Sequence, residues 1–212
     1  MTDGQLARTS RQALIGAFGL SAALWCASAA GDEIPQSAIV RFNTVCANCH
    51  EGECSGRLSF HSGAAAARQH MQRYLGPIVD TDVVAFFGLL RYTKENCAHY
   101  PQPGPIPANG IWTAADLNEW RNPDNGAYFI ALGHLAPGDY RLQLSFAHHA
   151  EGRLKITDQH FEPLVEATLS PAAEQEMTFT VMAGAHYLTL LSQAKLNGMI
   201  LRPAEKQAVG RR

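Results

Sequence analysis

The sequence predicts an α + β protein in two domains, a small all-α domain followed by an all-β antiparallel sandwich or jelly-roll-like domain. Three observations lead to this. Apolar residues recur at helical spacing between residues 36 and 97, four prolines fall within residues 101–107, and seven short runs of strand character follow. The composition, 46% hydrophobic and 17% charged, is typical of a globular protein. The net charge of -2 and the lack of a basic stripe exclude nucleic acid as a partner.

The first 29 residues have the pattern of a signal peptide. Arg8 and Arg11 give a positive start, Ala13 to Trp25 form an apolar run, and Ala27 to Ala30 supply small residues for cleavage. An uncleaved anchor is the alternative, but the apolar run is too short for a lasting membrane span. We therefore expect a periplasmic or otherwise exported protein with no transmembrane segment in the mature chain.

Three helices are predicted in the first domain, which we place at residues 36–100. The first covers 37–46 and carries its apolar residues on one side. The second covers 63–75, where four consecutive alanines favour a helix and Gly76-Pro77 ends it. The third runs from residue 81 or 82 to Tyr92 and is rich in aromatic residues. The stretch between His50 and the second helix is polar and contains glycine, which is typical of a loop.

The stretch Cys46-Ala47-Asn48-Cys49-His50 reads C-x-x-C-H, the attachment signature of a c-type haem. Thiols at this spacing can each form a thioether to one vinyl group of a porphyrin, and the histidine can then bind the iron as proximal ligand. The motif predicts one covalently attached haem c held by Cys46, Cys49 and His50. A redox-active cysteine pair and half of a zinc site are the competing interpretations. The first usually belongs to a thioredoxin-like unit and the second needs another ligand pair, and neither is evident in the sequence.

A helix before C-x-x-C-H and an aromatic-rich helix closing the domain resemble the monohaem c-type cytochromes over about residues 36–97. The resemblance implies a haem wrapped by helices, with one edge exposed for electron transfer to a redox partner protein. In that family a methionine after the motif often supplies the sixth iron ligand, but the usual methionine loop is not evident here.

The sixth ligand stays open between neighbouring residues of the second helix. Met71 falls on a helical stripe with Ala64, Ala67 and Leu75, so it could ligate the iron or fill ordinary core. His70 is the alternative, because adjacent helical residues point about 100° apart and only one of the pair can face the iron. His61 and an open site are further options. Arg57 could bond a haem propionate, or it could be solvated.

The remaining cysteines allow one disulfide. Cys26 would be removed with the signal peptide, which leaves Cys54 and Cys97. In an oxidising compartment these two are expected to pair and close a loop of about 43 residues. Independent buried thiols are the alternative.

Residues 101–111 are expected to be a proline-rich linker, residues 112–204 a β-sandwich domain and residues 205–212 a flexible tail. A short helical turn is predicted over 113–120, capped by Thr113. Turn signals separate the strand runs, which are 127–132, 139–146, 153–157, 164–169, 177–181, 186–191 and 199–201.

The predicted function is one-electron transfer by a periplasmic cytochrome, an electron carrier rather than an enzyme, with the sandwich as a docking or ligand-binding module. Trp112, Trp120 and Tyr128 could stack on a sugar or belong to the core. Two alternatives remain. One is a haem enzyme or a gas or redox sensor with an open or displaceable sixth position. The other is a carbohydrate- or ligand-binding protein with a tethered electron-transfer haem.

Overall fold

The computed structural model describes residues 34–50, 61–102, 104 and 106–204. The first described part is helical: α1 (Gln36–Arg41), the π-helix η1 (Phe42–Cys46) and α2 (Ala47–His50) follow one another directly, and α3 (Ala64–Leu75) and α4 (Asp80–Asn96) come next. All three predicted helices are therefore confirmed, with the first one extended through the motif to His50. None of the described helices is long and apolar enough to cross a bilayer.

The helices end where their backbone turns left-handed. α3 is followed by Gly76 at φ 73°, a conformation that glycine adopts without strain. α4 ends at Cys97, which has φ 48°. On α4 the buried side chains Val83, Phe86 and Leu89 recur every third residue, so one face of this helix is directed into the core.

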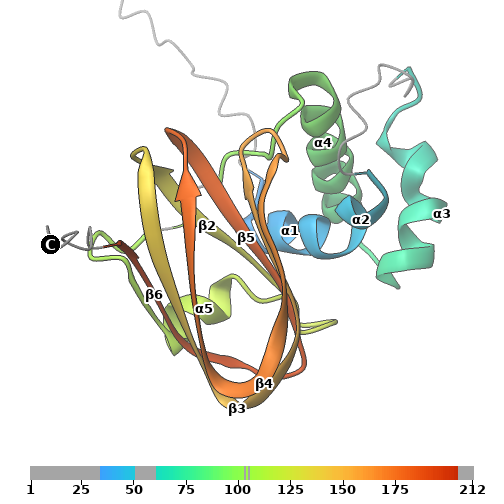
Figure 1. Ribbon diagram of the computed structural model, residues 1–212. Helices are drawn as coiled ribbons and strands as arrows, with labels where there is room; N and C mark the ends of the chain where they lie inside the picture. Colours follow the sequence, from blue (N-terminus) through green and yellow to red (C-terminus); the bar gives the residue numbers. More distant parts are fainter. Residues whose placement is uncertain (1–33, 51–60, 103, 105, 205–212) are drawn as a thin grey trace, which may run out of the picture. The chain divides into compact units, whose positions relative to one another are not determined.

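The rest of the described chain is dominated by one antiparallel sheet (Figure 1). Its strands are β1 (Ile111–Thr113), β2 (Tyr128–Leu135), β3 (Gly138–Asp158), β4 (Pro163–Val181), β5 (Gly184–Ser192) and β6 (Leu196–Pro203). The strand order is β1-β6-β3-β5-β2, and β4 pairs with β3. The predicted helical turn is confirmed as α5 (Ala114–Glu119), where Thr113 and Asp116 form a capping box.

The long hairpin of β3 and β4 curls the sheet (Figure 1). The first part of β3, residues 140–146, pairs with β6, whereas residues 152–158 pair with β5. Pairing of β3 with β4 is irregular between Ser145 and Gly152. Gly152 itself has a φ of 153°, and a Cβ atom at this position would collide with the carbonyl oxygen of Leu191. Two pairs of predicted short strands are thus single strands, because the turn signals at these places produce bulges instead of chain reversals.

Helices and sheet belong to one compact unit, Ile34–Arg212, and share one hydrophobic core. Buried hydrogen bonds join them: Asn122 Nδ2 donates to Thr44 Oγ1 at 2.8 Å, and the ring of His99 lies between Asn43 and Thr157. The predicted fold class, a separate all-α cytochrome-like domain plus a β-sandwich, is therefore wrong. α1 and η1 pack on β2 of the sheet, while α3 and α4 pack on these two elements and on each other, an arrangement that composition alone does not reveal. The predicted domain boundaries stay a prediction.

Candidate functional site

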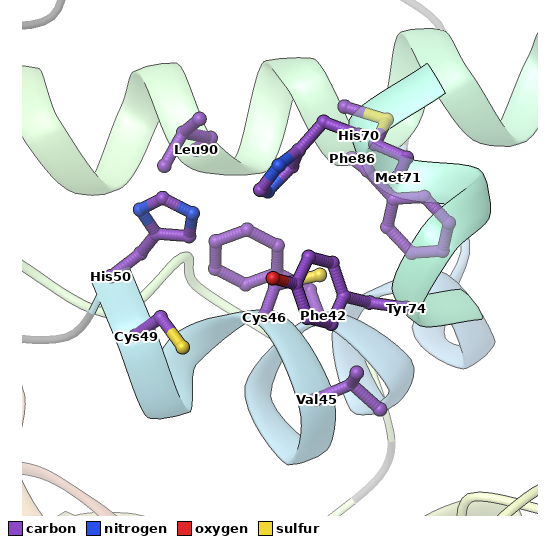
Figure 2. Close-up of a pocket in the computed structure, with 10 residues that line it drawn as sticks. All are labelled: Phe42, Val45, Cys46, Cys49, His50, His70, Met71, Tyr74, Phe86 and Leu90. Carbon is purple, nitrogen blue, oxygen red and sulfur yellow. The ribbon is translucent and has the colours of Figure 1, made fainter. Parts of the chain in front are cut away.

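A cavity of about 150 Å³ lies among η1, α2, α3 and α4 (Figure 2). We call it the thiol pocket. Most of its wall is apolar, with two thiols, two imidazoles and one phenol as its polar groups. Its lining residues are Phe42, Val45, Cys46, Cys49, His50, His70, Met71, Tyr74, Phe86 and Leu90.

The two cysteines of the motif carry free thiols with different exposure. Cys49 is exposed, whereas Cys46 is half-buried. Burial raises the pKa of the Cys46 thiol to about 11, with a smaller opposing effect of the Arg41 guanidinium. Cys46 is therefore a neutral thiol at neutral pH.

Cys97 is disulfide-bonded. Its predicted partner Cys54 lies outside the described residues, so the pairing of these two cysteines stays a prediction.

The imidazoles come from different helices. His50 on α2 and His70 on α3 make an edge-to-face contact with ring centroids 6.0 Å apart, and His70 also contacts Tyr74 at 5.1 Å (Figure 2). Met71 is buried at 6% exposure. Lys94 donates a hydrogen bond to the His50 carbonyl oxygen at 3.0 Å, which ties α4 to the end of α2.

The pocket gathers five residues that the sequence singles out: Cys46, Cys49, His50, His70 and Met71. Both candidates on α3 reach the cavity, although they are adjacent, because His70 enters from its exposed rim and Met71 from the core side. His61 is not among the lining residues. Arg57 lies outside the described residues.

The geometry does not support the predicted haem c. A cavity of about 150 Å³ is the size that accommodates benzene, and a porphyrin contains four five-membered rings. Within the described ranges, no group of three or more His, Cys, Asp or Glu side chains is placed to hold a metal ion. The haem c and metal-binding predictions are therefore wrong, and the five residues stand as a cluster of soft and aromatic side chains.

A second cavity, of about 480 Å³, lies over the sheet and is lined largely by polar side chains. We call it the polar cleft. Strand register places its groups in two rows that cross three strands, since directly paired residues point to the same face. One row is Thr168–Arg153–Leu191 and the other is Glu166–Lys155–Thr189. The rest of the lining comes from Asn43, Ala47 and Asn48 of the helical segment and from His99, Phe129, Leu154 and Ala167.

His99 lines the polar cleft as a neutral group whose two ring nitrogens are both hydrogen-bonded. Its Nδ1 lies 3.3 Å from Asn43 Oδ1 and its Nε2 lies 3.1 Å from Thr157 Oγ1. Burial, assisted by the charge of Lys155, lowers the pKa of His99 to about 3. The ring therefore fixes the helical segment to β3 without carrying a charge.

Sequence reasoning missed the polar cleft. Arg153 and Lys155 stand on either side of buried Leu154, and Glu166 and Thr168 stand on either side of half-buried Ala167, but only the register brings the two pairs together. The aromatic residues proposed for sugar stacking are core: Trp112, Trp120 and Tyr128 are at most 1% exposed.

Comparison with known proteins assigns no family. No family model matches the chain, and no curated protein matches it either. Among solved structures, a family 35 carbohydrate binding module from an environmental isolate is 13% identical, with a TM-score of 0.28, over 38% of this chain and 71% of that one. The C-terminal CBM6 of a laminarinase from Zobellia galactanivorans is 16% identical, with a TM-score of 0.27, over 36% of this chain and 73% of that one. An isomalto-dextranase from Arthrobacter globiformis T6 is 14% identical, with a TM-score of 0.29, over 35% of this chain, which spans 16% of the enzyme's length.

These findings correct the resemblance to monohaem c-type cytochromes. No cytochrome family model matches the chain, the described residues hold no group of three or more His, Cys, Asp or Glu placed for a metal ion, and the helices share one core with the sheet. The interpretation as a one-electron carrier depended on that resemblance and is corrected with it. A five-residue motif is short enough to occur in a chain that lacks the rest of the family's pattern.

Proposed function

We propose that this chain binds a carbohydrate in the polar cleft. The observation that carries the proposal is the pair of rows across β4, β3 and β5, which presents a guanidinium, an ammonium, a carboxylate and two hydroxyl groups beside an exposed leucine. A sugar ring offers hydroxyl groups that both donate and accept hydrogen bonds, together with an apolar face of C–H groups. Those are the two kinds of surface that this array matches.

The size of the array supports a ligand of one or two sugar rings. Same-face residues of a strand are about 7 Å apart and neighbouring strands about 5 Å apart, so the rows cover roughly 7 Å by 10 Å. The cavity of about 480 Å³ is within the usual range for small-ligand sites. Because the groups stand on paired strands, their spacing is fixed before the ligand arrives.

Arg153 is the principal donor in this proposal. It is exposed and makes no hydrogen bond or ion pair with any described residue. Its five N–H donors can therefore bind vicinal hydroxyl groups or a sugar carboxylate in a fork. Predicted export fits this function, because an exported protein meets the polysaccharides of cell walls and extracellular matrices.

The test is affinity electrophoresis of the purified full chain in gels containing laminarin, xylan or polygalacturonate. We expect retardation in at least one gel, and Arg153→Ala should weaken the binding by about tenfold or more, the effect of losing a charged hydrogen-bond donor. Arg141→Ala is the matched control, since it removes the same charge from the same strand outside the cleft. Equal mobility in all gels with and without polysaccharide would refute the proposal, as would equal binding by wild type and Arg153→Ala.

A further inference from the structure

The four residues of the C-x-x-C stretch are divided between two cavities. Cys46 and Cys49 line the thiol pocket, whereas Ala47 and Asn48, the residues between them, line the polar cleft. One short helical segment is thus the common wall of both cavities. A change in the backbone of this segment on the thiol side must move its other face as well.

The two thiols are spaced for a disulfide that closes only with such a change. Residues three apart on a helix have Cβ atoms about 5–6 Å apart, whereas a disulfide requires about 3.5–4.5 Å. Closure therefore needs a backbone shift of roughly 1–2 Å in the segment between the cysteines. The π-helix η1 ends at Cys46 and α2 begins at Ala47, so the shift falls on a junction between two helix types. Single π-helical turns within α-helical segments are frequent at functional sites.

We propose that Cys46 and Cys49 form a reversible disulfide that switches the polar cleft between two affinities. The inference rests on the proposed function of the cleft. Predicted export is consistent with it, because disulfides form and persist in oxidising compartments.

The redox step uses a disulfide as oxidant, whether of a protein or of a small molecule. The exposed thiol of Cys49 attacks as the thiolate, forms a mixed disulfide and releases one thiolate of the oxidant. The thiol of Cys46 then loses its proton, attacks the Cys49 sulfur and releases the second thiolate. Two electrons and two protons pass from the pair to the oxidant, which is reduced to two thiols. Since burial raises the pKa of Cys46 to about 11, the second attack is the slow one and accelerates with rising pH.

Asn48 transmits the change to the cleft. Its Nδ2 donates to the Thr44 carbonyl oxygen at 3.4 Å, and Asn125 Nδ2 donates to the same oxygen at 3.3 Å. The first of these bonds anchors the Asn48 side chain to the carbonyl oxygen one helical turn before it. A shift at residues 47 and 48 moves the exposed Asn48 side chain away from the position it has in the dithiol form. We expect the oxidised form to bind carbohydrate about tenfold more weakly, the effect of one lost hydrogen bond at the ligand.

The experiment compares the full chain equilibrated with oxidised or with reduced glutathione. Alkylation with iodoacetamide and peptide mass spectrometry should find both thiols free in the reduced sample and joined in the oxidised one. Affinity electrophoresis then measures binding in each state. Amide hydrogen exchange in residues 44–50 and in β3 and β4 provides a readout that needs no ligand. Cys49→Ser, at an exposed position, is the control: it should keep the affinity of the reduced form and lose the response to glutathione.

The outcomes separate the switch from the proposed function. Disulfide formation with weaker binding and altered exchange supports the switch. Disulfide formation with unchanged binding and unchanged exchange in β3 and β4 overturns the switch and leaves carbohydrate binding intact. Altered exchange in β3 and β4 without binding in either state supports the coupling and refutes the carbohydrate proposal. Sulfurs that never pair, or that carry an adduct which reduction does not remove, overturn the switch.

Discussion

The thiol pocket and the polar cleft share one wall but differ in how they are built. The thiol pocket is made by helix packing, and its reactive groups stand on an apolar wall that includes Phe86 at 1% exposure. The polar cleft is made by strand register, and four of its eight polar side chains are exposed: Asn48, Arg153, Glu166 and Thr168. The difference teaches that the first site is part of the hydrophobic core, whereas the second is a surface that the core supports. Mutations in the thiol pocket should therefore lower the free energy of unfolding more than mutations in the polar cleft.

The largest effect on stability is expected at Phe86, a core residue that lines the thiol pocket. The centroid of its ring lies 5.6 Å from Cζ of the Arg41 guanidinium. Phe86→Ala should lower the free energy of unfolding by about 3–5 kcal/mol, because it removes buried contacts and leaves a cavity. Urea denaturation measures this. Tyr74→Ala is the control on the same pocket: its ring is 58% exposed, and its loss should cost about 0.5 kcal/mol or less. Similar losses for both variants would show that the pocket is not continuous with the core.

The next effect is a pH dependence of stability that arises from His99 in the wall of the polar cleft. The folded pKa of His99 is about 3, below its ordinary value of 6.5, so the unfolded chain binds the proton more readily. The contribution of neutral His99 to the free energy of unfolding is complete above pH 6.5 and is lost as the pH falls toward 3. Between pH 7 and pH 4 the free energy of unfolding should fall by about 3 kcal/mol. Urea denaturation at both pH values measures it.

His99→Gln is the control for this pH dependence, because glutamine does not titrate. The difference between wild type and variant isolates His99 from His186, whose pKa burial also lowers. A parallel loss of stability on acidification in both proteins would contradict the buried neutral role of His99.

The hydrogen bond between Asn122 and Thr44, which links the helical segment to the chain before β2, should make a smaller contribution to stability. Thr44→Val removes the hydroxyl that accepts a hydrogen bond from Asn122, whose side chain is fully buried. The unfolding free energy should fall by about 1–3 kcal/mol, the cost of a buried donor left without a partner. Thr168→Val, a matched change at an exposed position of the cleft, should cost far less. Equal effects would mean that this hydrogen bond does not join helices and sheet.

The sequence predicts the thiol pocket better than the polar cleft for a physical reason. Cys46, Cys49 and His50 are contiguous, and His70 and Met71 are neighbours on one helix, so local periodicity already groups them. The prediction that this site holds a haem was wrong, because a motif specifies residue types and not the volume of the cavity between the helices. The cleft depends on the pairing of residues far apart in the chain, such as Arg153 with Leu191, 38 positions later, which no local pattern encodes.

The same reasoning explains the error in fold class. The helices, the helical turn and the alternation in residues 140–146 follow from local patterns and are confirmed. The union of helices and sheet in one core depends on buried contacts such as those of His99 and Asn122, which span many residues. A histidine and an asparagine in a sequence predict surface or loop positions, so their burial becomes visible only when the partners are in place.

The smallest effect on stability is expected in the cleft itself, at the residue proposed to matter most for binding. Arg153→Ala should change the free energy of unfolding by no more than about 0.5 kcal/mol, because the exposed guanidinium has no described partner to lose. Urea denaturation of wild type and variant measures this. A loss well above that limit would mean that Arg153 stabilises the fold, and reduced carbohydrate binding by the variant would then have a structural cause. A stable variant with weakened binding instead identifies the exposed cation as a group held by the sheet for a ligand.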